Sequence, residues 1–134
     1  MITLQELLTS PCDNKEHLEH LEDLLVKLNR LRAVYGKPLK ITSGYRSMAD
    51  HLRIYAQKGI TDQSKIPMKS KHLFGFATDM VPLAEPIEAF HDWIIENVDL
   101  MIEIGLWFER FENTPTWTHA QSVPPASGVR FFKP

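Results

Sequence analysis

A leucine-rich segment between residues 14 and 35 places the strongest constraint on the fold. Its leucines recur three and four residues apart, at positions 18, 21, 24, 25, 28 and 31. This spacing puts them on one face of an α-helix, so the helix needs a broad apolar surface to pack against. Asp13 with Glu16 three residues later predicts where the helix starts, and Gly36 predicts where it ends.

Further helices and strands alternate along the rest of the chain. The patterns predict helices at 3–8, 47–58, 86–98 and 99–104, and strands at 39–43, 76–81, 106–112, 116–121 and 129–134. Residues 59–70 show neither pattern, so we expect an exposed loop there. An early helix, separated strands and a late strand pair are typical of an α+β domain. We therefore expect a single domain over residues 1–134, with an antiparallel sheet flanked by helices.

Composition excludes several classes of protein. The formal net charge is −2, without the basic stripe that nucleic-acid-binding proteins usually carry. No apolar run approaches 18 residues, so no membrane span is expected. The first residues lack the apolar core of a signal peptide, which predicts synthesis in the cytoplasm. Cys12 is the only cysteine, so any metal site must use His, Asp and Glu. We also expect the protein to be a monomer.

Strand alternation brings three candidate metal ligands together. In the strand at 76–81, Asp79 shares a face with Ala77, and in the strand at 116–121, His119 shares a face with Gln121. If these strands are neighbours, Asp79 and His119 meet across the sheet. His72, just before a turn at Gly75, can fold over the same spot. Two imidazoles and one carboxylate around an open position are the ligand set of a catalytic zinc site.

On pattern alone, structural histidines are the more common explanation, because six His and seventeen acidic residues produce such a triple in many chains. His51 and His91 fall on the polar sides of their helices and are expected at the surface. Lys69 and Lys71, in the loop before His72, are expected to be solvated. The triple therefore needs support from other motifs.

Three ordered motifs supply that support. SKHLFGFATD, at residues 70–79, resembles the SxHxxGxAxD signature of the zinc D-alanyl-D-alanine carboxypeptidases, whose relatives include phage endolysins and vancomycin-resistance dipeptidases. Upstream, ITSGYRS resembles that family's SGYRS element, and downstream, WTH resembles its W-x-H segment. The three matches occur in the family's order and extend from residue 41 to residue 119. The resemblance implies the hedgehog/DD-peptidase type of fold.

The resemblance also implies roles for individual residues. His72, Asp79 and His119 would be the zinc ligands. Arg46 would bind a substrate carboxylate or carbonyl, because its planar fork can donate two parallel hydrogen bonds. Ser70 would orient a ligand or contact substrate. Tyr45, between Gly44 and Arg46, is the aromatic residue expected nearest the substrate.

The general base is where the chain departs from the family. Its best-known members carry a Glu three residues before the last His, where this chain has Thr116. Glu112 and Glu109 are the substitutes, and in a regular strand they would point to opposite faces. Single-domain phage-type relatives carry the Glu at the end of the preceding strand. This favours Glu112, with Glu109 as the second choice.

The implied activity is zinc-dependent hydrolysis of peptidoglycan stem peptides, either removing a terminal D-Ala or cutting within the stem. A compact chain of this kind resembles phage or prophage lysis enzymes, which act at the cell wall or in the periplasm after release. Thr116 favours one alternative, a non-catalytic wall-binding or phage structural domain that retains the fold. A metal-free α+β interaction protein is the other alternative.

Overall fold

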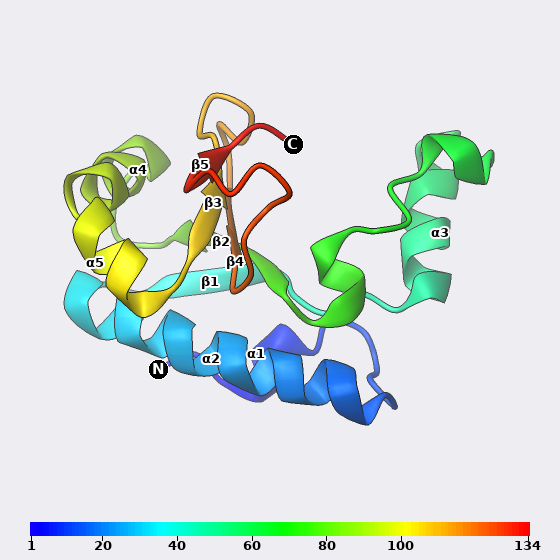
Figure 1. Cartoon of the computed structure of the whole chain (residues 1–134), viewed down its shortest axis with the longest axis horizontal. Helices are drawn as coiled ribbons and strands as arrows, with labels where there is room; N and C mark the ends of the chain where they lie inside the picture. Colours follow the sequence, from blue (N-terminus) through cyan, green and yellow to red (C-terminus); the bar gives the residue numbers. More distant parts are fainter.

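The computed structural model describes all residues from 1 to 134 and contains one five-stranded sheet with helices around it (Figure 1). Its elements, in chain order, are α1 (Leu4–Leu7), α2 (Lys15–Tyr35), β1 (Leu39–Ser43), α3 (Met48–Gln57), the 3-10 helices η1 (Gln63–Lys65) and η2 (Lys71–Phe74), β2 (Ala77–Pro82), α4 (Ile87–Glu96), α5 (Val98–Ile104), β3 (Trp107–Glu109), β4 (Thr118–Gln121) and β5 (Phe131–Phe132). None of the helices combines the length and apolar character needed to cross a membrane.

Helix α2 supplies much of the core, as the leucine spacing predicts. The leucines at positions 21, 24, 28 and 31 are fully buried, and those at 18 and 25 are half-buried along the edge of the stripe. The helix starts one residue later than predicted, because the side chain of Asn14, not Asp13, accepts a hydrogen bond from the backbone N–H of His17. Gly36, in the left-handed conformation with φ of 75°, ends it as expected.

The strands run in the order β1-β2-β4-β3-β5. The first three pairings are antiparallel, as expected, and the short edge strand β5 pairs with β3 in parallel. Strand β3 is also shorter than the predicted 106–112. The chain turns after Glu109, where the N–H of Asn113 bonds to the carbonyl of Arg110. Side chains beyond Glu109 therefore no longer follow the alternation of a strand.

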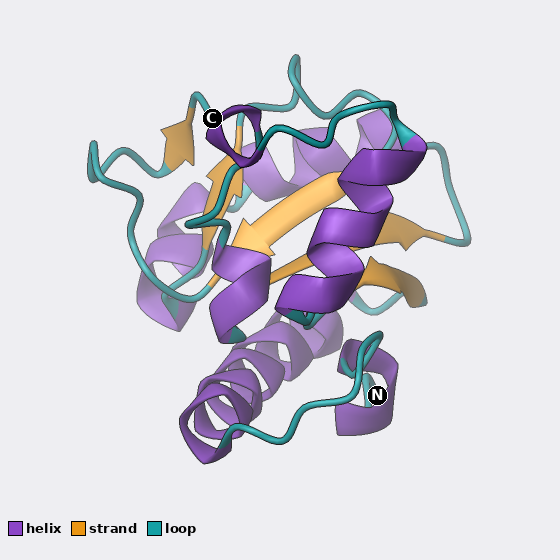
Figure 2. Cartoon of the chain, turned by 90° about the vertical axis from the view of Figure 1, so that its right-hand side faces the viewer, coloured by secondary structure: helices purple, strands orange, loops and turns teal.

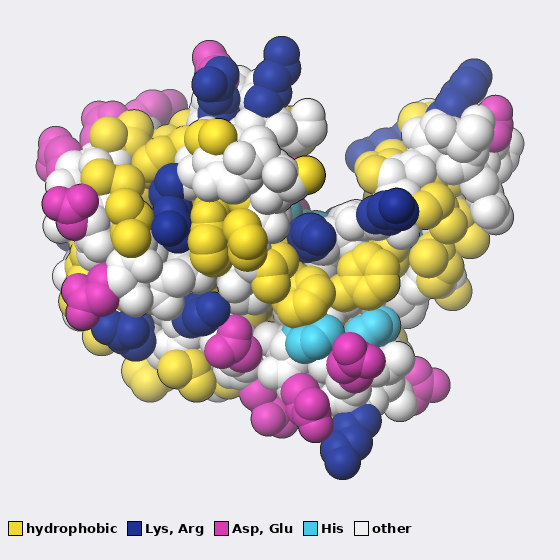
Figure 3. Space-filling model, viewed as in Figure 1, with side chains coloured by type: hydrophobic (Ala, Val, Ile, Leu, Met, Phe, Trp, Pro, Cys, Tyr) yellow, Lys and Arg dark blue, Asp and Glu magenta, His cyan; other side chains and the backbone are white.

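A protruding segment, residues 48–70, stands apart from the sheet (Figure 1). We call it the arm; it comprises α3, the following loop and η1. Figure 2, seen from the side of α3, shows the strands behind this helix and the long α2 below them. The loop expected at 59–70 is present, with the short η1 within it. The arm's position leaves a hollow between it and the sheet, which Figure 3 shows with Lys and Arg side chains beside it.

The prediction of surface positions for two helical histidines is wrong. His51 is fully buried and His91 is nearly so. The ring of His91 stacks on Phe111, and its Nε2 lies 2.9 Å from the hydroxyl oxygen of Thr118. Burial lowers the pKa of His91. The polar side of α4 therefore faces β4, and the hydrogen bond to Thr118 offsets the cost of burying the imidazole of His91.

Candidate metal centre

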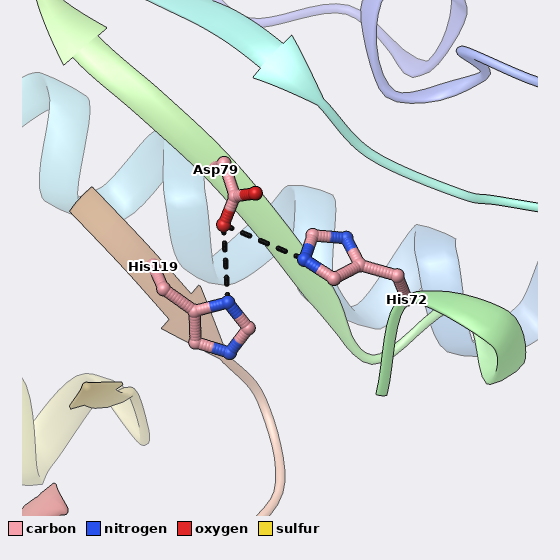
Figure 4. Close-up of side chains that lie close together, drawn as sticks. All are labelled: His72, Asp79 and His119. Atoms are coloured by element: carbon pink, nitrogen blue, oxygen red, sulfur yellow. Dashed lines mark hydrogen bonds and ion pairs between the residues drawn. The ribbon is translucent and has the colours of Figure 1, made fainter. Parts of the chain in front are cut away.

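Strands β2 and β4 bring together the residues that alternation predicted. Asp79 is directly opposite His119 in the antiparallel register, and His119 Nδ1 lies 3.0 Å from Asp79 Oδ1 (Figure 4). Both side chains lie on the face of the sheet that borders the hollow. The predicted meeting of Asp79 and His119 across the sheet is therefore confirmed.

His72 reaches the same place from η2. Its Nε2 lies 3.4 Å from Asp79 Oδ1, and its Nδ1 lies 2.9 Å from the backbone carbonyl of Gly44 (Figure 4). Gly75 ends η2 with φ of 81°, and a Cβ there would lie 2.5 Å from the carbonyl oxygen of His17. Only glycine therefore allows this turn to pack against α2 and present His72 to the sheet.

Three ligand atoms thus converge. One atom from each of His72, Asp79 and His119 lies within 4.8 Å of the others. Nitrogen and carboxylate oxygen are donors that zinc binds, and three protein ligands with one open position are typical of catalytic zinc sites. The Gly44 carbonyl can only accept a hydrogen bond, so Nδ1 of His72 carries the proton and its Nε2 lone pair faces the other ligands. The donor set fits a zinc ion.

The electrostatics of the three residues favour a positive charge among them. Burial by itself would raise the pKa of Asp79, but the hydrogen bonds of His119 and His72 outweigh it and hold that pKa well below its usual range. Burial opposes protonation of His119, yet its pKa is raised because Asp79 and Glu109 lie beside it. A site that stabilises positive charge at this point is suited to a cation.

The position of the two glutamates reverses the order of preference. Glu109, the last residue of β3, points into the hollow, and its Oε1 lies 3.9 Å from His119 Nδ1. Glu112 lies beyond the turn, is 71% exposed and pairs with Arg110 at the surface. Its expected place beside the metal ligands is wrong, because β3 ends before it. Thr116, at the position where the best-known family members carry their Glu, is also exposed.

Of the three residues expected to bind substrate, two line the hollow. Arg46 and Ser70 border it together with the metal ligands. Tyr45 does not: its side chain is buried against the core, and its hydroxyl lies 3.1 Å from His17 Nδ1. It lines a separate, smaller hollow beside the start of α2. Tyr45 is therefore not among the residues that line the cleft at the metal centre.

Arg46 is held in place by His51, although the helical pattern predicts a surface position for this histidine. Nε2 of His51 lies 3.0 Å from the carbonyl of Pro67, so it donates there, and Nδ1 accepts from Arg46 Nη1 at 3.2 Å. A second guanidinium nitrogen donates to the hydroxyl of Ser43. Burial lowers the pKa of His51, and the nearby charge of Arg46 adds to this. His51 therefore ties the arm to Arg46.

The hollow is a cleft of about 760 Å³ between the sheet and the arm. Five cationic side chains line it, Arg46, Lys58, Lys69, Lys71 and Lys133, and none of them forms an ion pair with a carboxylate. Its only acidic residues are Asp79 and Glu109, both at the metal centre. The cleft is thus basic although the chain has a net charge of −2. The lysines at 69 and 71 border the cleft, which their loop position had not indicated.

Comparison with known proteins shows a family and two solved structures that this chain resembles. The family described as Peptidase M15 matches residues 1–105, which include His72 and Asp79 but end before Glu109 and His119. The solved structure of VanYB in complex with D-alanine-D-alanine aligns with a TM-score of 0.51 and 19% identity, over 77% of this chain and 70% of that one. The Serratia marcescens L-Ala D-Glu endopeptidase ChiX aligns with a TM-score of 0.52 and 21% identity, over 86% and 92%. No curated protein matches the chain.

The two structural alignments confirm the predicted DD-peptidase-like fold class. The family match extends over most of the chain and contains two of the three ligands. Zinc is the cofactor of peptidases in this family, and the donor set of His72, Asp79 and His119 fits it. The chain therefore belongs to the Peptidase M15 family of zinc-dependent peptidases.

Proposed function

We propose that this chain hydrolyses peptide bonds of peptidoglycan stem peptides. The observation that carries the proposal is the placement of a zinc-ligand triad and a free glutamate, Glu109, at the base of one open cleft. VanYB binds D-alanine-D-alanine and ChiX is an L-Ala D-Glu endopeptidase, so both similar proteins recognise peptides of this chemical kind.

His72, Asp79 and His119 would hold the zinc ion, which when bound polarises the scissile carbonyl and activates water. Glu109 borders the same position, with Oε1 3.9 Å from His119 Nδ1. From there it can take a proton from the attacking water and pass it to the leaving amine. Arg46 lines the cleft and can bind a substrate carboxylate or carbonyl.

The basic lining agrees with an acidic substrate. Stem peptides carry free carboxylates, and a cleft lined by one sign of charge concentrates ligands of the opposite sign. The unpaired lysines at positions 69 and 71 lie on the arm side of the cleft, so they can contact a stem peptide whose scissile bond lies at the sheet side. Both terminal trimming and internal cleavage are compatible with a cleft that is open to solvent.

The test combines metal content with hydrolysis of purified peptidoglycan, for the wild type and His119→Ala. We expect close to one zinc per wild-type chain and release of peptide fragments, both lost in the variant. Defined peptides ending in D-Ala-D-Ala, or containing an L-Ala–D-Glu bond, identify the bond that is cut. Bound zinc without turnover would instead support the non-catalytic wall-binding or phage structural domain, and no zinc in either protein would overturn the peptidase proposal.

The cellular role is a further part of the proposal. Stem peptides lie outside the cytoplasmic membrane, so an active enzyme has to reach the cell wall after its synthesis. A lytic role in a phage or prophage predicts that expression together with a membrane-permeabilising protein lyses the host. It also predicts that the His119→Ala variant does not lyse it.

A further inference from the structure

Gln121 is a buried amide beside the metal centre. It follows His119 by two residues on β4, so the two side chains share a face of the sheet. Only 2% of its surface is exposed, and its Oε1 lies 3.0 Å from His119 Nε2. Its place on the ligand's face is visible in the sequence, but its contact with the ligand is not.

The orientation of this amide is determined by a second contact. Nε2 of Gln121 donates to the backbone carbonyl of Val123 at 2.9 Å. A carbonyl oxygen only accepts, so the amide nitrogen must face Val123 and the amide oxygen must face His119. The amide oxygen also only accepts. Nε2 of His119 therefore carries a proton, and Nδ1 is the nitrogen left to bind a metal ion.

The other histidine of the site is fixed in the opposite way. The carbonyl of Gly44 accepts from Nδ1 of His72, so Nε2 is the free nitrogen of that ring. Nδ1 of one histidine and Nε2 of the other thus face the same carboxylate oxygen of Asp79, at 3.0 and 3.4 Å. Without a metal ion these two nitrogens can donate protons to the carboxylate, and a bound cation would take the place of those protons among the same three atoms. Two acceptors, one backbone carbonyl and one amide, thus prepare the site for a metal.

We propose that Gln121 is a positioning residue of the zinc centre, which holds His119 so that Nδ1 binds the metal. The inference rests on the zinc centre of the proposed function. Partners that orient a ligating histidine typically change metal affinity by about 10- to 100-fold. Gln121 acts through His119 and has no assigned contact with substrate.

The test measures zinc affinity by competition with a chromophoric chelator, so it needs no turnover. Gln121→Met keeps the approximate volume but removes the acceptor, and we expect zinc to bind about 10- to 100-fold more weakly. Gln121→Glu keeps an acceptor for His119 and should remain within about threefold of wild type. Thr118→Val is the matched control: it removes a histidine hydrogen bond from the neighbouring position of β4, on the opposite face, and should leave zinc affinity unchanged.

A spectroscopic measurement on the wild type supplies the second readout. Nitrogen-15 NMR of the zinc-loaded protein should show His119 with the metal on Nδ1 and a proton on Nε2. Zinc on Nε2 would overturn the inference, even if Gln121→Met fails to fold. A folded Gln121→Met protein that binds zinc as tightly as Thr118→Val would also overturn it.

The outcomes separate this inference from the proposed function. Weakened zinc binding in Gln121→Met, together with a wild type that cleaves no peptidoglycan, supports the positioning role and contradicts the hydrolase. Unchanged zinc binding in an active enzyme does the reverse. A wild type that binds no zinc overturns both.

Discussion

The sheet side of the cleft is held by strand register, whereas the arm side is held by a few side-chain hydrogen bonds. Four residue pairs join β2 to β4, and Asp79 opposite His119 is one of them. On the arm side, His51 accepts a hydrogen bond from Arg46 and donates one to the carbonyl of Pro67 within the arm, and Asp50 accepts one from the hydroxyl of Ser10. The metal ligands and Glu109 come from the sheet and from η2 packed beside it, and most of the lysines come from the arm or its ends. The proposed chemistry thus lies on the side held by strand register, and the proposed substrate contacts lie on the side held by a few hydrogen bonds.

The largest effect should come from Glu109 on the sheet side. Glu109→Gln removes the proposed base and should lower kcat by about 10²- to 10⁴-fold, with KM and zinc content unchanged. Glu112→Gln makes the same chemical change at an exposed position and should keep activity within about twofold. Steady-state kinetics and metal analysis check both. Loss of activity in Glu112→Gln alone would contradict the assignment, and loss of zinc in Glu109→Gln would make that residue a ligand.

The link between the two sides gives the next effect. His51→Leu leaves the carbonyl of Pro67 and the guanidinium of Arg46 without their buried partner. We expect the free energy of unfolding to fall by about 1–3 kcal/mol and KM to rise, because Arg46 loses its orientation. Urea unfolding and kinetics measure the two changes. Arg53→Leu, which breaks only an exposed ion pair on the same helix, should change stability by less than about 1 kcal/mol.

The arm's charges should affect substrate capture without affecting zinc. Replacing both Lys69 and Lys71 by Glu should lower kcat/KM by about tenfold at low salt, and added salt should shrink the difference. The control pair, Lys40→Glu with Lys65→Glu, changes the net charge equally but lies outside the cleft lining. An equal loss in the control pair would show that net charge, and not the cleft, attracts the substrate.

A pH effect at His91, which packs on the face of the sheet away from the cleft, should be the smallest. Burial lowers the pKa of His91 below its ordinary 6.5, so the unfolded chain takes up this proton at a higher pH than the folded chain. The corresponding stability is complete above pH 6.5 and is lost as the pH falls below it, by up to about 1.4 kcal/mol per pH unit. His91→Phe should remove this contribution. Unfolding curves at pH 7.5 and 5.5 check it, and identical pH slopes for the two proteins would contradict it.

Strand alternation predicted that Asp79 and His119 meet, because a period of two places side chains reliably once two strands are neighbours. It placed Asp79 and His119 on faces that meet, and the register confirms this. The same rule failed for Glu112, because the chain leaves the sheet after Glu109 and alternation has no meaning in a turn. The end of a strand depends on its pairing with residues that are distant in the sequence, and a local sequence pattern carries no information about that pairing.

Burial of polar side chains was the other part that the sequence did not reveal. His51, on the polar side of its helix, is buried because the following loop folds back and offers the carbonyl of Pro67. Tyr45 turns toward α2 because Gly44 packs against α1, where a Cβ would lie 2.1 Å from the carbonyl oxygen of Leu7. Such contacts join segments far apart in the chain, so only the assembled fold shows them.

The parallel pairing of β5 with β3 has a practical consequence for anyone who handles this protein. It carries the last residues back across the molecule, so that Lys133 and Pro134 border the cleft, while Met1 lies exposed elsewhere (Figure 1). A purification tag attached after Pro134 would emerge at the mouth of the cleft and compete with substrate. The same tag attached before Met1 would leave the entrance open.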